Sequence, residues 1–123
     1  MPHQRNGPVI VVEDDEAVRN SLKFALELEG LEVRLYRSGL ELLAEEHLEA
    51  CGCLVVDDEM PGLSGCELIQ ELRNREVKCP AILIAATVSN ALLTRAKRCG
   101  ARCVLAKPLE DDILLREIAT ALH

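Results

Sequence analysis

The sequence is almost without aromatic residues. It has no Trp, and aromatic residues make up only 2% of the 123 residues. Proteins that bind single-stranded nucleic acids commonly stack the bases on aromatic side chains, so this scarcity argues against such a surface. The hydrophobic fraction is nevertheless 49%. The chain therefore has enough apolar material for one compact domain, with a core built from Leu, Val, Ile and Ala.

Excess positive charge and long apolar runs are also missing. Lys and Arg number 14 against 21 Asp and Glu, and the formal net charge of −7 argues against direct binding to nucleic acid. No apolar run approaches the roughly 20 residues of a membrane span. The polar start, MPHQRNG, lacks the apolar core of an export signal. We therefore expect a cytoplasmic protein without membrane contact, in which residues 1–7 form a disordered extension and residues 8–123 form the domain.

Short apolar runs alternate with segments of helical periodicity along the rest of the chain. The runs are bounded by turn-forming residues and carboxylates, and the other segments place apolar residues on one helical face. The predicted strands are 8–12, 31–36, 51–56, 80–86 and 102–106. The predicted helices are 16–30, 39–50, 65–75, 91–100 and 110–123.

This alternation predicts the fold class. Parallel strands need crossover connections, and right-handed crossovers place helices on both faces of the sheet. We expect an α/β fold, a three-layer, doubly wound, five-stranded parallel sheet in the flavodoxin-like order 2-1-3-4-5.

Acidic residues and one lysine follow the predicted strands, at the edge where open parallel sheets bind ligands. Glu13 and Asp14 follow the first strand, Asp57 and Glu59 the third, and Lys107 the fifth. Converging carboxylates repel one another unless a cation neutralises them, and oxygen-rich clusters suit Mg²⁺. A carboxylate beside the metal can attack a phosphoryl group, and the lysine can stabilise the phosphoryl oxygens. Taken singly, any of these acids could be a solvated loop residue or a helix N-cap.

Three sequence blocks resemble the receiver domain of two-component response regulators. They are VIVVEDDEAVRNSL, LVVDDEMPGLSGCELIQEL and GARCVLAKPLEDD, and the resemblance extends over the chain from Pro8 onward. The sequence is most similar to the nitrogen-fixation regulator subfamily, whose receivers precede a helix-turn-helix output domain. The resemblance implies a signalling phosphoacceptor, not an enzyme with a separate substrate, that promotes its own phosphotransfer from a histidine kinase or a phosphotransfer protein.

The resemblance assigns roles to the acidic residues. Asp57, three residues before the Met-Pro pair, is the expected phosphoacceptor. Asp14 is expected to bind Mg²⁺ directly, Glu13 mainly through bound water, and Glu59 through its backbone carbonyl. Asp58 falls at a position that the family leaves variable.

The resemblance also covers the residues after the last strand. Lys107 matches the lysine of the family, which makes it a catalytic residue alongside the phosphoacceptor. Receivers typically have a cis peptide bond before the following proline, here Pro108, and proline permits it at modest cost.

Two positions depart from the family pattern. After the fourth strand the family has Ser or Thr, whose hydroxyl bonds to the phosphoryl group, but this chain has Ala85. The switch aromatic, three residues before the lysine, is replaced by Val104. Thr87 could supply a hydroxyl only if the loop changed shape. The carboxylates and Lys107 are all present, so we expect Asp57 to be phosphorylated. A conformational response also needs a ligand that interacts differently with two states, so we expect the relay from the phosphoryl group to the rest of the domain to be weak.

Six cysteines are present, and without an export signal they are expected to be reduced thiols. In the predicted fold five of them gather at the end of the sheet opposite the phosphoacceptor, within reach of disulfide or metal-ligand distance, and Cys66 lies apart. The plain interpretation is that they are small buried hydrophobes, and the alternative is a redox or metal-sensing role. The five gathered cysteines are Cys51, Cys53, Cys79, Cys99 and Cys103.

Three functions remain open from the sequence. The first is the phosphoacceptor. The second is a phosphorylation-independent interaction module, with thiol or metal sensitivity as an option, that acts through the fourth helix, fifth strand and fifth helix. That same surface is a candidate for homodimer formation. The third, a small Mg²⁺-dependent phosphohydrolase, is disfavoured because the 123 residues hold no cap or separate substrate-binding segment.

Overall fold

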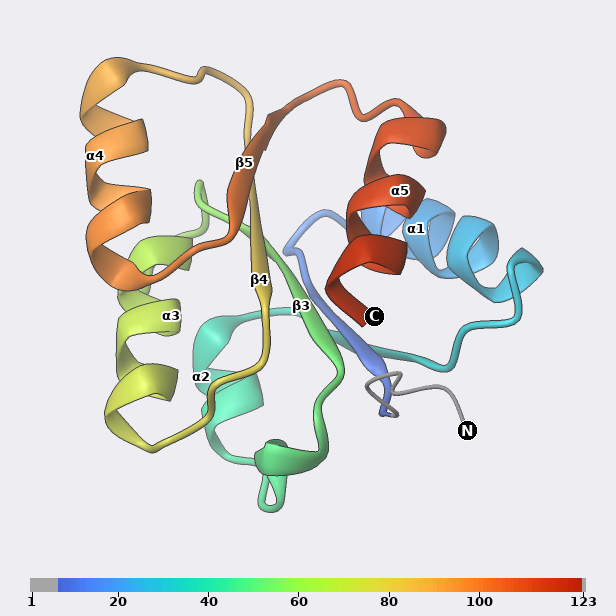
Figure 1. Ribbon diagram of the computed structural model, residues 1–123, viewed down its shortest axis with the longest axis horizontal. Helices are drawn as coiled ribbons and strands as arrows, with labels where there is room; N and C mark the ends of the chain where they lie inside the picture. The colour runs from blue at the N-terminus through green and yellow to red at the C-terminus, as the bar shows by residue number, and fades with distance from the viewer. Residues whose placement is uncertain (1–6, 123) are drawn as a thin grey trace.

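The computed structural model describes residues 7–122 and has a five-stranded parallel sheet at its centre (Figure 1). Its strand order, β2-β1-β3-β4-β5, is the predicted flavodoxin-like order. The predicted extension of residues 1–7 lies, except for Gly7, outside the described residues. The strands are β1 (Val9–Val12), β2 (Val33–Tyr36), β3 (Cys53–Asp57), β4 (Ala81–Ala85) and β5 (Cys103–Ala106).

Helices cover both faces of the sheet, which confirms the three-layer architecture. In Figure 1, α1 and α5 lie on one side of the sheet, and α2, α3 and α4 lie on the other. The helices are α1 (Glu16–Leu28), α2 (Gly39–Leu43), α3 (Gly65–Asn74), α4 (Asn90–Cys99) and α5 (Asp111–Leu122).

The central strands have buried side chains on both faces, and this explains their continuous apolar sequences. Every residue of β3 and β4 is buried. Leu54 and Val56 belong to the core under α2, α3 and α4, whereas Val55 belongs to the core under α1 and α5. The alternating segment in β2 is at the edge of the sheet, as its pattern predicts.

The predicted helix over residues 39–50 was wrong in extent. The α-helix ends at Leu43, and only a short 3₁₀ turn, Leu48–Ala50, follows. His47 has a φ of 62°, in the left-handed region, and therefore cannot continue a right-handed helix. The buried residues Leu42 and Leu48 are six positions apart, a spacing that does not keep both on one helical face.

The start of α3 ties the fold to the acidic edge of the sheet. Ser64 accepts a hydrogen bond from the Glu67 N–H, and the Glu67 carboxylate accepts one from the Ser64 N–H, which completes a capping box. Gly65 follows directly, and a Cβ there would stand 2.6 Å from a Leu83 methyl and 2.9 Å from the Asp57 carbonyl. Only glycine fits this close approach of α3 to the end of β3.

The cap gives a stability prediction. Ser64→Ala removes one half of the capping box, so we expect the free energy of unfolding to fall by about 1 kcal/mol. The pKa of Glu67, which the hydrogen bonds with Ser64 hold below its ordinary value, should rise at the same time. Chemical denaturation measures the first change and carboxyl NMR the second. Ser21→Ala, in the exposed middle of α1, is the matched control and should leave both unchanged, and an equal loss of stability in the two variants would contradict the role of the cap.

Candidate functional site

Two buried carboxylates lie side by side where β1 and β3 end. Glu13 is 1% exposed and Asp57 is 2% exposed, and they are the buried charged residues of residues 7–122. Val12 and Val56, the residues directly before them, are register partners in the adjacent strands, and this pairing brings the two carboxylates together. A buried carboxylate needs a cation or hydrogen-bond donors, so this pair requires partners from elsewhere in the fold.

Lys107 supplies the positive charge from the end of β5. Its Nζ lies 2.7 Å from Oδ2 of Asp57 and 3.4 Å from Oε2 of Glu13. Burial lowers the pKa of Lys107, but the ion pairs with Asp57 and Glu13 outweigh that effect and raise the pKa above its ordinary value. The lysine is therefore fully charged at neutral pH. The peptide bond between Lys107 and Pro108 is cis, as the resemblance predicted.

Glu13 is the less well compensated of the two buried carboxylates. Burial, followed by the nearby Asp57, raises the pKa of Glu13 to about 7, although the hydrogen bond from the Asp15 N–H and the charge of Lys107 oppose the rise. Its Oε2 accepts no hydrogen bond from the described residues. One lysine thus incompletely neutralises two buried acids, and a further cation would favour the ionised form of Glu13.

The geometry fits a hard divalent cation. Carboxylate oxygens of Glu13, Asp14 and Asp57 all lie within 4.8 Å of one another, and Asp14 is exposed at the mouth of the cluster. Mg²⁺ takes oxygen ligands and keeps several waters, so one exposed and two buried carboxylates suit it. Oε2 of Glu13 accepts no hydrogen bond from the described residues and has only the 3.4 Å ion pair with Lys107, and this is the observation that most directly calls for a further cation.

Glu59 connects the acidic edge to the loop after β4. Its N–H donates to Oδ1 of Asp57 at 2.9 Å, which orients the carboxylate opposite Lys107. Its own side chain accepts a hydrogen bond from the Ala86 N–H. This second contact was not predicted, because the resemblance assigns a role only to the backbone carbonyl of Glu59. A carboxylate two positions beyond a strand end offers no signal of which neighbouring loop it will reach.

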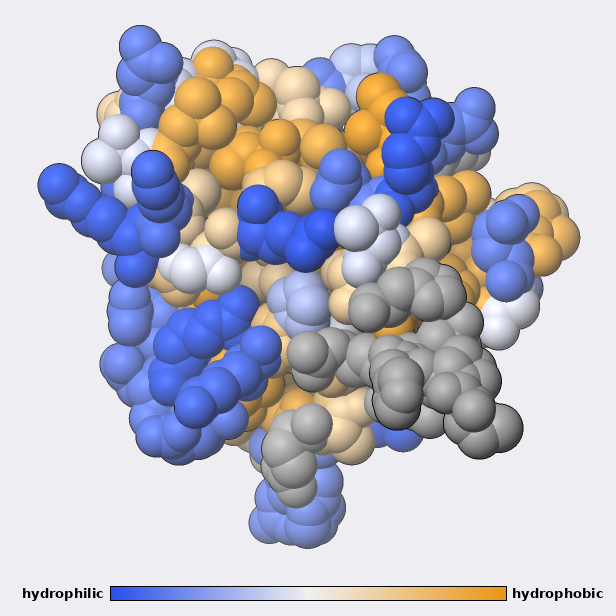
Figure 2. All heavy atoms as spheres, viewed as in Figure 1, coloured by the Kyte–Doolittle hydropathy of each residue, from blue (hydrophilic) through white to orange (hydrophobic). Residues whose placement is uncertain are grey.

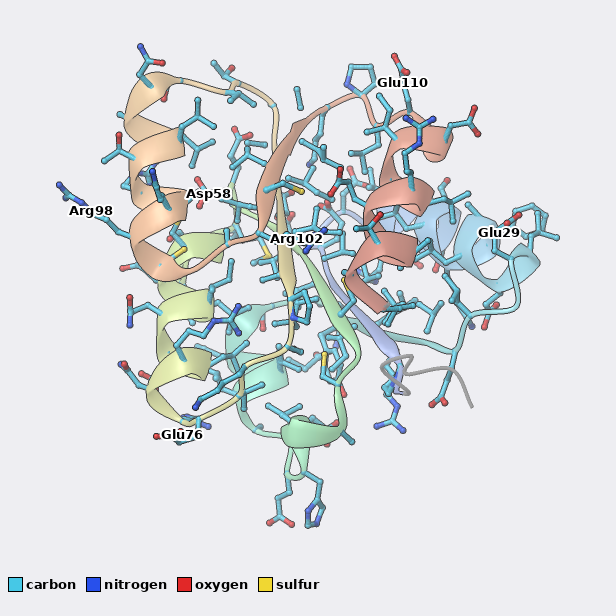
Figure 3. The ribbon with its side chains drawn as sticks, viewed as in Figure 1. Glu29, Asp58, Glu76, Arg98, Arg102 and Glu110 are labelled. Atoms are coloured by element: carbon cyan, nitrogen blue, oxygen red, sulfur yellow. The ribbon has the colours of Figure 1, made fainter. Side chains whose placement is uncertain are left out.

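Asp58 points away from this cluster, although it is adjacent to Asp57 in sequence. Its Oδ1 accepts the Cys66 N–H at 3.2 Å, and its Oδ2 lies 3.8 Å from Arg95 of α4. Figure 3 accordingly shows Asp58 on the α4 side of the sheet. Successive side chains along an extended chain point to opposite sides. Asp57 therefore lies in the acidic cluster, and Asp58 contacts α3 and α4 instead.

Arg19 of α1 is a supporting residue that the sequence did not reveal. Its Nη1 donates to the Glu13 carbonyl at 3.0 Å and to the Asp14 carbonyl at 3.4 Å. The arginine fixes the loop that presents both acids. Its spacing from Glu13 and Asp14 matches no recognised motif, so only the folded structure identifies it.

Two of the predicted switch positions, Ala85 and Thr87, lie at or after the end of β4, whereas Val104 lies within β5 opposite Leu83. Ala85 is buried at the end of β4, Val104 is half-buried in β5, and Thr87 is exposed in the loop after β4. The Lys107 N–H donates to the Ala85 carbonyl at 2.9 Å and joins the ends of β4 and β5. Position 85 therefore lies beside the lysine, and its side chain is a methyl group, whereas the family has a hydroxyl there that can bond to the phosphoryl group.

Among the described helices, none is long and apolar enough to cross a membrane.

Comparison with known proteins identifies strong similarities. Residues 9–119 match the response regulator receiver domain family. The transcriptional regulatory protein FixJ of Azorhizobium caulinodans is 36% identical over 115 residues, which cover 94% of this chain and 54% of that protein. FixJ of Rhizobium meliloti is 34% identical over 113 residues, covering 92% and 55%. This chain therefore spans about half the length of these curated relatives.

Solved structures show the same architecture. The crystal structure of FixJ-N has a TM-score of 0.84 and 32% identity, and the match covers 94% of this chain and 93% of that one. The chemotaxis protein CheY4 of Vibrio cholerae has a TM-score of 0.87 and 25% identity, with coverage of 94% and 98%.

The acidic cluster gives a prediction about metal binding. Mg²⁺ at ten times its dissociation constant should stabilise the protein by about 1.4 kcal/mol, which corresponds to a rise of roughly 5 °C in Tm. Asp14→Asn removes an exposed ligand charge and should abolish most of this rise. Asp15→Asn is the matched control, because Asp15 caps α1 and asparagine caps equally well. Thermal unfolding with and without Mg²⁺ makes the comparison, and an unaltered Mg²⁺ response in Asp14→Asn would contradict the assignment.

Proposed function

The chain belongs to the response regulator receiver domain family, and from this premise we propose that its Asp57 accepts a phosphoryl group in a Mg²⁺-dependent reaction. Receiver domains are signalling proteins that interact with histidine kinases or phosphotransfer proteins. The observation that carries the proposal is the pairing of Asp57 with Lys107 at 2.7 Å in a buried acidic cluster. We also propose a cytoplasmic location, which is general for response regulators.

In the proposed reaction, one oxygen of the Asp57 carboxylate attacks the phosphorus of a phosphohistidine. The new P–O bond forms an acyl phosphate while the P–N bond breaks, and the leaving imidazole takes up a proton. The hydrogen bond from the Glu59 N–H fixes Oδ1 and so orients the carboxylate for attack. Lys107 then turns its charge from the carboxylate to the phosphoryl oxygens, where negative charge is concentrated. The domain thereby promotes its own modification without acting on a separate substrate.

Four residues would hold the metal in this scheme. Asp14 and Asp57 offer carboxylate oxygens, Glu59 offers its backbone carbonyl, and Glu13 acts mainly through water. The bound Mg²⁺ supplies positive charge next to the transferring phosphoryl group. The unsatisfied Oε2 of Glu13 supports this assignment.

A protein phosphodonor fits the surroundings of Lys107. A hollow of about 530 Å³ between α1 and the segment after β5 is lined mostly by apolar residues, together with Ser21 and Lys107. Phe24, one of the residues that line it, is 67% exposed and offers a large apolar side chain to a partner. Since Lys107 both lines this hollow and contacts Asp57, we propose that the histidine-bearing partner covers the hollow.

We propose that the relay beyond Asp57 is weak. Ala85 has no hydroxyl to bond with the phosphoryl group, and Val104 has no ring that could change position. The Ala86 N–H, a donor next to the site, is already occupied by the Glu59 carboxylate. A phosphoryl group therefore has few differential contacts with which to shift the loop after β4.

The apolar surface around β5 favours a second function, that of an interaction module. In Figure 2 apolar side chains gather over β5 between α4 and α5. Leu93 of α4 is 45% exposed and Ile113 of α5 is 41% exposed. This is the surface on which a homodimer or another protein partner was predicted. Binding of a partner there without phosphorylation would not depend on the relay from Asp57.

Adduct formation with beryllofluoride tests the phosphoacceptor proposal. We expect Mg²⁺-dependent binding of this phosphoryl mimic, observed as a bound signal by fluorine NMR. Asp57→Asn should lose the adduct, because the beryllium is held by a negatively charged carboxylate oxygen, which the amide does not provide. Asp58→Asn is the control at the adjacent acid and should retain it. Loss in both variants, or retention in Asp57→Asn, would refute the assignment.

The weak relay has its own test. In the wild-type chain, adduct formation should shift backbone amide NMR signals mainly near residues 57–59, 85–87 and 107. In the double variant Ala85→Thr/Val104→Phe, which restores a hydroxyl and a ring, the shifts should extend through α4 and β5. Shifts of similar extent in both proteins would show that the relay works without these groups.

A further inference from the structure

Two cysteine thiols meet at the end of the sheet opposite Asp57. Sγ of Cys51 and Sγ of Cys79 are 3.0 Å apart, and the side chains are 3% and 4% exposed. Cys51 lies in the segment before β3, and Cys79 lies in the loop before β4. In Figure 3 this loop is marked by Glu76, far from Asp58 at the other end of the molecule.

The backbone brings these two positions together. Leu54 of β3 is the register partner of Ala81 of β4, so the residues just before the two strands are neighbours. The Gly52 N–H donates to the Pro8 carbonyl at 2.9 Å and anchors the segment that carries Cys51. Both thiols enter the core under α2, α3 and α4, and therefore face the same side of the sheet.

The predicted grouping of five cysteines was only partly right. Cys103 and Cys53 belong to the core on the opposite face of the sheet. Cys99 lies with Cys66, which was expected to be separate, where α4 contacts α3. Burial, followed by the nearby Cys99, raises the pKa of the Cys66 thiol to about 12. The C-terminal end of α4 therefore lies beside the N-terminal end of α3. The periodicity of apolar residues in the sequence does not predict how two helices are positioned against each other.

We propose that Cys51 and Cys79 form a reversible disulfide and are a redox modification site. A disulfide needs an S–S distance of about 2.05 Å, so the two sulfur atoms must approach each other by about 1 Å. Neighbouring loop ends can supply this movement more easily than the interior of two strands. The site lies at the edge of the sheet away from the phosphoacceptor, and it goes beyond the proposed function.

A hydroperoxide is a suitable oxidant because it is small enough to reach the two thiols when the loops that carry them open locally. The thiolate of one cysteine attacks a peroxide oxygen, the O–O bond breaks, and a sulfenic acid forms with release of water or an alcohol. The sulfur of the second cysteine then attacks the sulfenic sulfur. The S–S bond forms, the S–O bond breaks, and the hydroxide leaves as water with the proton of the second thiol. Two thiols are oxidised by two electrons, and the peroxide is reduced by the same two.

The surroundings of the two thiols determine how fast they are oxidised. The hydrogen bond with Cys79, together with burial, raises the pKa of the Cys51 thiol. Thiolate is the reactive form, so oxidation is slow in the closed protein and proceeds through local opening of the two loops. Once formed, the disulfide closes a loop between positions 28 residues apart, a loop that contains β3 and α3. This constraint on the unfolded chain should stabilise the domain.

The experiment counts thiols in the full 123-residue chain. The protein is treated with hydrogen peroxide, unfolded, blocked with N-ethylmaleimide and weighed by mass spectrometry. Of the six cysteines, two should escape blocking, and treatment with dithiothreitol should restore all six. The oxidised protein should melt roughly 5 °C or more above the reduced protein.

Matched variants identify the pair. Cys51→Ala and Cys79→Ala should each remain fully blocked and show no oxidant-dependent rise in Tm, whereas Cys99→Ala and Cys103→Ala should still lose two thiols. Circular dichroism confirms that each variant is folded, and the two separate single variants protect the test if one of them unfolds. Retention of all six thiols in the oxidised wild-type chain would overturn the proposal. Loss of two thiols that persists in Cys51→Ala and Cys79→Ala would do the same.

Discussion

The ion pair between Lys107 and Asp57 is the interaction on which the functional architecture depends. Two carboxylates, Glu13 and Asp57, are buried at adjacent strand ends, and burial of acids without compensation is costly. Lys107 reaches both from the end of β5, which β3 and β4 separate from β1, so the charges of three strands meet at one point. The sheet order is what makes this possible, because parallel strands present all their carboxyl ends at the same edge.

Lys107 alone does not neutralise the negative charge of the cluster, and this imbalance favours the binding of a divalent cation. Glu13 has an unsatisfied oxygen and a raised pKa, and Asp14 stands exposed beside it. A divalent cation would satisfy Glu13, and a phosphoryl group would then share both the cation and Lys107. The same edge, where burial of two carboxylates is costly, is therefore suited to a doubly charged cation. At the other end of the sheet, Cys51 and Cys79 can act independently, because the buried apolar strands separate the two places.

Much of this arrangement was predictable, for identifiable reasons. Continuous apolar strands and amphipathic helices predicted the sheet and its three layers, and strand ends predicted where Glu13, Asp57 and Lys107 converge. The sequence failed where tertiary contacts override local pattern. His47 adopts a left-handed conformation between α2 and the following 3₁₀ turn, Glu59 reaches across to Ala86, and Cys99 meets Cys66. Each depends on how neighbouring loops or helices are placed, and residue spacing along the chain does not encode that placement.

We propose that the phosphoryl group is accepted by Asp57, and that the adjacent Asp58 serves instead to anchor α3 and α4. Treatment with acetyl phosphate and Mg²⁺, followed by borohydride reduction and peptide mass spectrometry, locates the acyl phosphate, since the reduction converts the modified aspartate to homoserine. The account predicts homoserine at position 57 alone. Homoserine at position 58, or at neither position under conditions where Mg²⁺ binds, would contradict it.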